Sequence, residues 1–351
     1  MMGKHGNSQR PGQNRVRELV LTHGYHANAY QILNPGMLHW FSRDQQAVVG
    51  YVKRGHWWVA AGAPICYAAH LQQVAVEFQA GAKRDRCRVC YSFAEQPLVD
   101  CLKPLGHKTI ALGAQPVWVP DEWPDLLQTH RSLRQQIRRA GNKGVYIQAF
   151  TPAQARADSR FHHCLRLWLG HKPLSPMGFL VQPAALETGY PDRLIWGALQ
   201  PGGAAGEKLI AFLLASPVPR RNGYLVEQIV RHPAAPNGTV EMLIDTCMME
   251  LHRRGSGYLT QGPVALSCHA AGAMAANPWW MRSLMQLSRR HLGRWYGFQT
   301  LDSFRARMRP NRWEPVYAIV CGSQFIPGAL YAMARAFFSP SPVPTPRPTG
   351  T

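Results

Sequence analysis

Strand-like segments alternate with helix-like segments through residues 47–320, and this alternation restricts the chain to layered folds that combine helices with a sheet. Most of the strand-like segments carry β-branched or aromatic residues between Gly, Pro or charged residues. The order strand–strand–helix–strand–strand occurs in both halves. We therefore predict an α/β fold with mixed sheets and a duplicated domain. The expected strands span residues 47–52, 57–61, 88–93, 108–112, 145–150, 194–198, 209–215, 224–230, 257–260 and 316–320.

Two helices have a well-defined pattern. The segment 239–254 places apolar residues at helical spacing, with acidic residues near its start and basic residues near its end, as the helix dipole favours. Asn237 and Gly238 precede it and Gly255 follows it, and such residues commonly flank helices. A second helix is expected over 125–140, with an apolar side and a side rich in arginine.

Composition along the chain predicts how it is divided. Residues 1–20 are expected to form a disordered basic N-terminus, and residues 339–351 a Pro-rich disordered tail. Between them we expect a first domain over 21–150 and a second domain over 151–325 that carries the site. The segment 326–338 is expected to be a helix, which either closes the core or lies on a membrane surface.

The charge balance indicates the kind of partner. The chain carries 39 Lys and Arg against 19 Asp and Glu, a net charge of +20, which favours nucleic acid or an anionic membrane face. No apolar run reaches the roughly 20 residues that span a bilayer, and the polar N-terminus lacks the apolar core of a signal peptide. We therefore expect a cytoplasmic protein with reduced cysteines. Cys87 and Cys90 have metal-ligand spacing, but no second such pair follows, so no metal site is expected.

A strand over 224–230 leads through a turn rich in Pro and Gly into the helix that follows. Such a junction presents backbone N–H groups at the positive end of a helix, where they can bind a phosphate or a developing oxyanion. Arg231 lies at the end of the strand and faces the same space. A purely structural turn is the alternative. The expected backbone donors are those of Asn237, Gly238 and Thr239.

A second basic segment lies near the C-terminal end of the expected second domain. It contains Arg305, Arg307, Arg309 and Arg312, followed directly by Trp313. Guanidinium groups bind phosphate through paired hydrogen bonds and stack on bases or indoles. Although a solvated basic face is the usual meaning of such a run, its density and the net charge favour a phosphate-rich ligand.

Five motifs, in order along residues 47–320, together resemble a known family. They are GYVKRGHWWVAAGAPIC (50–66), RSLRQQIRRAGNKGV (131–145), VEQIVRHPAAPNGTVEMLIDTCMMELHRRG (226–255), LTQGPVALS (259–267) and LDSFRARMRPNRWEPVYAIV (301–320). The chain resembles the soluble C-terminal domain of bacterial phosphatidylglycerol lysyltransferases, also called the multiple peptide resistance factor family. In particular, the last motif looks like that family's closing block.

The resemblance implies two tandem acetyltransferase-like (GNAT) domains. It also implies transfer of an amino acid from aminoacyl-tRNA to a hydroxyl of a membrane lipid, with aminoacyl-tRNA and an anionic phospholipid as partners and without a cofactor. Integral members of the family carry a transmembrane region. We expect a stand-alone form that is cytoplasmic and peripheral on the inner face of the membrane.

The family motif also implies site residues. Its carboxylate position falls on Gln228, with Glu227 adjacent as a substitute base, and its two lysines fall on Arg305 and Arg307. The implied catalytic residues are Glu227, Gln228 and Arg231. The implied substrate-binding residues are Asn237, Gly238, Thr239, Arg305, Arg307 and Trp313. We predict that Arg231, Arg305 and Arg307 converge on one cleft beside the Asn237–Gly238 turn.

Two other functions are compatible with these residues. An acyl-CoA-dependent GNAT acyltransferase would need a pyrophosphate loop, but the loop RHPAAPNGT has Pro where amide donors are required. A non-catalytic RNA- or membrane-binding protein on a decayed transferase fold is favoured by Gln228 and Arg305, which replace a carboxylate and a Lys of the family pattern.

Overall fold

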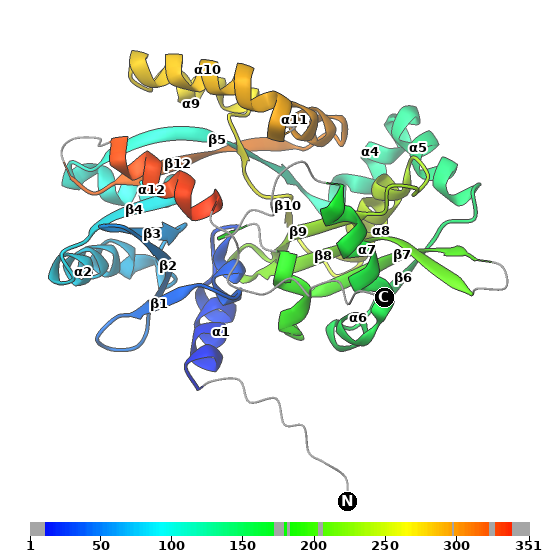
Figure 1. Cartoon of the computed structure of the whole chain (residues 1–351), viewed down its shortest axis with the longest axis horizontal. Coiled ribbons are helices and arrows are strands. Elements are labelled where there is room, and N and C mark those ends of the chain that lie inside the picture. The colour runs from blue at the N-terminus through cyan, green and yellow to red at the C-terminus, as the bar shows by residue number, and fades with distance from the viewer. Residues whose placement is uncertain are drawn as a thin grey trace, which may run out of the picture.

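One mixed sheet of 12 strands runs through the molecule (Figure 1). The computed structural model describes residues 11–171, 179–180, 183–202, 206–296, 298–322 and 327–338. The strand order is β1-β2-β3-β4-β12-β5-β10-β9-β8-β7-β6, with β11 beside β5. The strands are β1 (Leu38–Phe41), β2 (Val48–Arg54), β3 (Trp57–Ala61), β4 (Arg88–Ala94), β5 (Lys108–Trp118), β6 (Tyr146–Phe150), β7 (Leu194–Pro201), β8 (Glu207–Val218), β9 (Gly223–Arg231), β10 (Tyr258–Thr260), β11 (Val264–Ala265) and β12 (Arg312–Val320).

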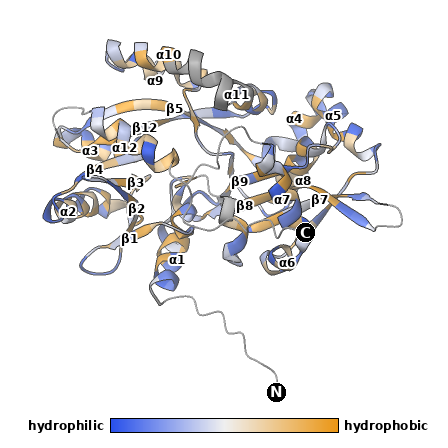
Figure 2. Cartoon of the chain, in the orientation of Figure 1, coloured by the Kyte–Doolittle hydropathy of each residue, from blue (hydrophilic) through white to orange (hydrophobic). Residues whose placement is uncertain are grey.

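Helices cover both faces of this sheet. In the first half, α2 and α3 pack on one face and α1 and α12 on the other; in the second half, α8 with α4 and α5 faces α6 and α7. Apolar residues accordingly concentrate along the strands (Figure 2). The helices are α1 (Pro11–His23), α2 (Leu71–Arg84), α3 (Gln96–Leu102), α4 (Trp123–Thr129), α5 (Arg131–Gly141), α6 (Pro152–Ala157), α7 (Ser159–Gly170), α8 (Thr239–Arg253), α9 (Ala271–Ala275), α10 (Trp279–Tyr296), α11 (Phe298–Arg307) and α12 (Pro327–Phe338).

The two halves of the sheet repeat one topology. Strands β1, β2 and β3 form an antiparallel meander, and α2 then connects β3 to the parallel strand β4. Strands β7, β8 and β9 form a second meander, and α8 connects β9 to the parallel strand β10. The expected mixed α/β class with two GNAT-like halves is therefore confirmed.

The halves exchange their last strands, which corrects the predicted domain boundaries. Strand β5 follows β4 in the chain but pairs with β10, whereas β12 follows β10 in the chain but pairs with β4. Strands β5 and β12 also pair with each other at the centre of the sheet. The division into 21–150 and 151–325 is thus wrong, because residues 312–320 belong to the sheet of the first half.

The N-terminal segment is only partly as predicted. Residues 11–20, expected to be disordered, form most of helix α1, because Val16, Leu19 and Val20 bury one side of it in the core. Residues 1–10 and the tail 339–351 lie outside the described residues.

The helix expected over 326–338 is α12, which buries Ala329, Ala332, Met333 and Ala336 in the same core as α1. No helix among the described residues has the length and apolar character to cross a bilayer.

The helix expected over 125–140 is interrupted. His130 has a non-helical conformation, with φ −105° and ψ 85°, which separates α4 from α5. Both helices pack against α8, so they belong to the second half although the prediction placed them in the first. Strands β1 and β11 were not predicted, because four and two residues, respectively, are too few to show a clear strand pattern.

Candidate functional site

The parallel strands β9 and β10 separate before β9 ends. Strand β9 is paired with β10 from Gly223 to Leu225. From there to Arg231, β9 is paired, among the described strands, only with β8, on its other side. A β-bulge lies at the point of separation, because Leu214 pairs with Gln228 and Ala215 pairs with Val226. Glu227 therefore has no partner residue on β8. Ligands of α/β proteins commonly bind where the carboxyl ends of neighbouring strands diverge.

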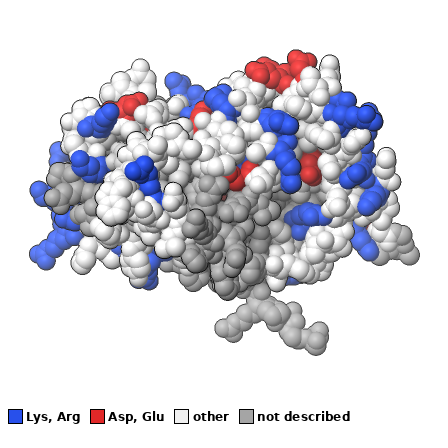
Figure 3. Space-filling model, turned by 90° about the horizontal axis from the view of Figure 1, so that it is seen from above, with Lys and Arg blue, Asp and Glu red and all other residues white. Residues whose placement is uncertain are grey.

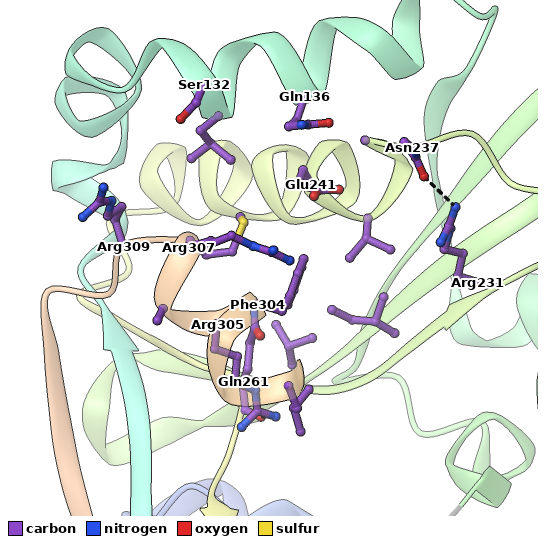
Figure 4. Close-up of a pocket in the computed structure, with 18 of the residues that line it drawn as sticks. Ser132, Gln136, Arg231, Asn237, Glu241, Gln261, Phe304, Arg305, Arg307 and Arg309 are labelled. Atoms are coloured by element: carbon purple, nitrogen blue, oxygen red, sulfur yellow. Dashed lines mark hydrogen bonds between the residues drawn. The ribbon is translucent and has the colours of Figure 1, made fainter. Parts of the chain in front are cut away.

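A cavity of about 1220 Å³ occupies the space that this divergence opens (Figure 4). Its walls come from α5, β9, the start of α8 and the second half of α11, with Gln261 beyond the end of β10. This volume exceeds the ~300–1,000 Å³ of typical small-molecule pockets, so the cavity can hold part of a larger substrate.

The cavity lining is strongly basic. It contains Arg139, Arg231, Arg305, Arg307 and Arg309, and its acidic members are Glu227 and Glu241. None of these arginines forms an ion pair with a carboxylate of the described residues. In Figure 4 the side chain of Arg307 extends across the cavity. Figure 3 shows the molecule from above, and on this face Lys and Arg side chains are more widespread than Asp and Glu side chains.

The predicted convergence of three arginines is found in the structure. Arg231, Arg305 and Arg307 line this one cavity together with Asn237 and Gly238. The Nη2 of Arg231 donates to the backbone oxygen of Ala235 at 2.5 Å and to Oδ1 of Asn237 at 3.4 Å, so Arg231 braces the turn.

Gly238 is required at its position. It has a φ of +93°, and a Cβ atom there would lie 1.9 Å from the backbone oxygen of Gln136 on α5. This close approach fixes α5 against the start of α8. Thr239 does not line the cavity: it is buried, and both its N–H and its hydroxyl donate to the backbone oxygen of Pro236.

Glu227 cannot act as the base that the sequence suggested. Its backbone borders the cavity, but its side chain is 2% exposed and points to a polar cluster between the halves. There its carboxylate accepts hydrogen bonds from Asn34 at 2.6 Å, from Arg193 at 3.1 Å and from the hydroxyl of Ser216. The bulge explains the orientation, because an extra residue breaks the alternation of side chains along β9.

Two further predicted residues lie elsewhere. Gln228 does not line the cavity; it shares the opposite face of the sheet with Val230, because side chains alternate along a strand. Trp313 stacks on the ring of His269, with 4.0 Å between ring centroids and 7° between planes, and also lies outside the cavity lining.

Arg305 is buried rather than exposed to solvent. Its Nη1 donates to the backbone oxygen of Gly262 at 2.7 Å and its Nη2 to that of Gln261 at 2.5 Å. Burial lowers the pKa of the Arg305 guanidinium to about 9, although the nearby carboxylate of Asp302 opposes that shift. Arg305 thus joins α11 to the loop after β10, so that substitution by alanine would loosen the cavity floor.

The sequence analysis missed several polar residues of the cavity, among them Glu241 and Gln261. Glu241, in the first turn of α8, is half-buried, and no ion-pair or hydrogen-bond partner is found for its carboxylate among the described residues. Gln261 is 6% exposed at the floor. The signal for Glu241 was its position, since it lies four residues beyond Asn237 on the helix that the turn opens.

A group of possible metal ligands lies outside the cavity lining. Cys268, His269 and Asp302 each offer a ligand atom, and these atoms lie within 4.8 Å of one another. The buried carboxylate of Asp302 already accepts hydrogen bonds from the Ser267 hydroxyl at 2.6 Å and from the backbone N–H and the thiol of Cys268. This arrangement caps the short 3₁₀ turn Cys268–Ala270.

Comparison with known proteins gives the same assignment as the motifs. Residues 17–320 match the family described as phosphatidylglycerol lysyltransferase, C-terminal. The chain belongs to this family. A curated relative is the lysylphosphatidylglycerol biosynthesis bifunctional protein LysX of Mycobacterium sp. (strain KMS), which is 23% identical over 254 residues. The match covers 68% of this chain and spans 22% of the length of that relative.

Solved structures of the phosphatidylglycerol lysyltransferase family share the fold. The C-terminal domain of an Agrobacterium fabrum protein classed with lysylphosphatidylglycerol synthetases has a TM-score of 0.75 at 17% identity, covering 93% of this chain and 97% of that one. The L-PGS of Bacillus licheniformis has a TM-score of 0.72 at 18% identity, covering 96% and 99%. The chain therefore belongs to a family of transferases and shares the fold of these solved structures.

Proposed function

We propose that this protein transfers an aminoacyl group from aminoacyl-tRNA to a hydroxyl of an anionic phospholipid. The observation that carries the proposal is the cavity between β9 and β10, which is lined by five arginines and by the carboxylate of Glu241, for which the described residues supply no partner. Both substrates bring phosphate next to the reacting groups, and arginine binds phosphate well. Membership of the phosphatidylglycerol lysyltransferase family supports the same reaction class.

In the proposed reaction, the cavity residues accept a proton and bind phosphate groups. The lipid hydroxyl attacks the carbonyl carbon of the ester, the bond to the ribose oxygen breaks, and the ribose hydroxyl leaves with a proton. Glu241 would accept the proton of the attacking hydroxyl, because its carboxylate borders the cavity without a described partner. Arg231 and Arg307 would hold phosphate groups at the mouth. An ester is already activated, so positioning supplies much of the rate.

Helix α5 supplies a surface for the tRNA. It forms one wall of the cavity, and its exposed side carries Arg131, Arg138 and Arg139. Arg134 has a different task, since it donates to the backbone oxygens of Leu127 and Gln128 and so joins α5 to α4. A row of exposed arginines beside a cavity suits the backbone phosphates of an acceptor stem.

Helices α10 and α12 supply a surface for the membrane. The inner side of α10 packs on a cluster around Ile110, which Leu330 of α12 also contacts, while Trp279 is 73% and Tyr331 66% exposed on the outside. Leu284 and Leu287 are also exposed on α10. Exposed aromatic and aliphatic side chains beside cations are typical of peripheral membrane binding. Because α10 leads into α11, a docked lipid would lie near the cavity, and the protein would act at the inner face of the membrane.

A transfer assay tests the proposal. Purified protein is incubated with lysyl-tRNA charged with labelled lysine, or with other aminoacyl-tRNAs, and with phosphatidylglycerol vesicles; the lipids are then extracted and analysed by mass spectrometry. We expect an aminoacylated lipid from wild type. Binding of tRNA and vesicles without product would support the non-catalytic alternative. Acyl transfer from acetyl-CoA in a parallel reaction, without lipid product, would support the acyl-CoA alternative.

A further inference from the structure

Two buried hydrogen-bond donors on the cavity floor have no acceptor among the described residues. They are Nε2 of Gln261 and Nε of Arg305, in residues that are 6% and 9% exposed. Both residues line the cavity and lie together at its floor in Figure 4. A buried donor without an acceptor costs about 1–3 kcal/mol. Two such donors in one cavity indicate that a ligand supplies the acceptor.

The guanidinium of Arg305 and the loop that carries Gln261 are held in place by hydrogen bonds. Each Nη atom of Arg305 donates to a backbone oxygen, Nη1 to Gly262 and Nη2 to Gln261, and these two bonds fix the plane of the guanidinium and with it the direction of the Nε–H. The loop itself is fixed, because Gly262 has a φ of +74° and its N–H donates to the hydroxyl of Thr260 at 3.0 Å. The guanidinium of Arg305 and the backbone that carries Gln261 therefore keep their positions when a substrate enters.

The number and burial of the donors decide which acceptor fits. A phosphate group presents several charged oxygens and suits the exposed guanidinium groups of Arg307 and Arg309. Two N–H groups at a desolvated floor suit a single oxygen instead. Fixed donors of this kind stabilise negative charge that develops on an oxygen during acyl transfer.

We infer that Gln261 and Arg305 form a two-donor subsite that binds the carbonyl oxygen of the aminoacyl ester and stabilises its negative charge during transfer. The inference rests on the proposed function and adds to it a specific place for the reacting carbonyl. Arg305 also holds the loop, so Gln261 is the residue through which the subsite can be tested.

The test combines a donor-free variant with a matched control. Gln261→Met keeps the size of the side chain and removes its donors. Gln79→Met serves as control, since Nε2 of Gln79 is likewise buried without an acceptor among the described residues but lies on α2, outside the cavity. In the transfer assay we expect kcat of Gln261→Met to fall about 10²- to 10³-fold, with KM for aminoacyl-tRNA nearly unchanged, and Gln79→Met to match wild type.

A binding measurement separates this inference from the proposed function. Calorimetry compares 3′-lysylamino-3′-deoxyadenosine, which has an amide carbonyl, with an analogue in which that carbonyl is reduced to CH₂. Wild type should bind the carbonyl compound about tenfold more tightly, and Gln261→Met should abolish this difference. Equal weakening of both compounds, or no binding by folded wild type, would overturn the inference. If wild type forms no lipid product but the difference is seen, the proposed function fails and the subsite stands.

Discussion

The two halves contain equivalent β–α–β junctions, yet only the second contains the large cavity. In the first junction, β3 and β4 stay paired to the end of β3, and the N–H of Gly62 continues the ladder by donating to Ser92. His26 packs directly on Gly62, and Ile65 bridges to Val48. In the second junction the strands separate after Leu225.

The difference shows what converts a structural junction into a site. The topology is the same in both halves, and so is the helix that begins after the turn. What differs is a bulge in β9, the early end of β10, and the segments that lie against each junction. The segment after α1 fills the first junction, whereas α5 and α11 surround the second and leave its centre open.

The largest expected effect concerns the carboxylate that is present only at the open junction. Glu241→Gln should lower the rate of aminoacyl transfer about 10²- to 10⁴-fold, because it removes the proposed proton acceptor. Glu250→Gln, at the other end of α8, should retain the wild-type rate. Single-turnover transfer with charged tRNA measures both. A wild-type rate for Glu241→Gln would assign proton transfer to another group.

The glycines of the two junctions should separate stability from activity. Gly238→Ala should cost about 2–4 kcal/mol of unfolding free energy and most of the activity, because its methyl group would displace α5. Gly62→Ala meets the ring of His26 and should cost a similar or smaller amount, about 1–3 kcal/mol, with the kcat of the folded fraction retained. Urea unfolding and transfer assays check both. Equal loss of kcat in the two variants would contradict the functional difference between the junctions.

Cationic side chains at the open junction should act on binding. Arg307→Ala and Arg231→Ala should each weaken tRNA binding about tenfold or more at low salt, because a charge-assisted contact is lost. The effect should shrink as salt rises, since exposed phosphate contacts are screened. Arg84→Ala on α2 of the first half is the control and should bind as wild type does. Filter binding at several salt concentrations measures tRNA affinity for the series. If all three variants bind alike, the arginines of the cavity form only a solvated basic face.

The closed junction should show the smallest effect, in its pH dependence. Burial, with the nearby guanidinium of Arg221, lowers the pKa of His26 to about 4. An unfolded His has a pKa of about 6.5, so between these values the unfolded state binds more protons and stability falls as pH falls. We expect a loss of about 1 kcal/mol between pH 7 and pH 5.5. Chemical unfolding at each pH measures it, and His26→Phe should show a shallower acid slope. An unchanged slope would mean that His26 is not the group responsible.

Local sequence patterns predicted the secondary structure of the site well. Helix α8 begins at Thr239 as expected and ends at Arg253, one residue before the prediction, because its apolar spacing and flanking glycines define it locally. Strand β3 has the predicted bounds, Trp57–Ala61. Convergence of Arg231, Arg305 and Arg307 on one cavity also followed from motif order and the family resemblance.

What the sequence could not supply depends on long-range pairing. The bulge that turns Glu227 away from the cavity follows from pairing with β8, and no residue in β9 itself predicts it. The burial of Arg305 depends on carbonyl groups from the loop after β10. The interruption at His130 and the packing of α5 on α8 likewise arise from tertiary contacts.

The strand exchange at the centre of the sheet sets the order in which this chain can fold. During synthesis β4 and β5 emerge early, but the strand that lies between them, β12, emerges near the end. Until then each presents an unpaired edge, the kind of surface that promotes aggregation. Pairs so distant in sequence also slow folding, since a long loop must close before the contact forms. A chain truncated before residue 312 would keep every element of the first half that precedes it and still lack a complete first sheet.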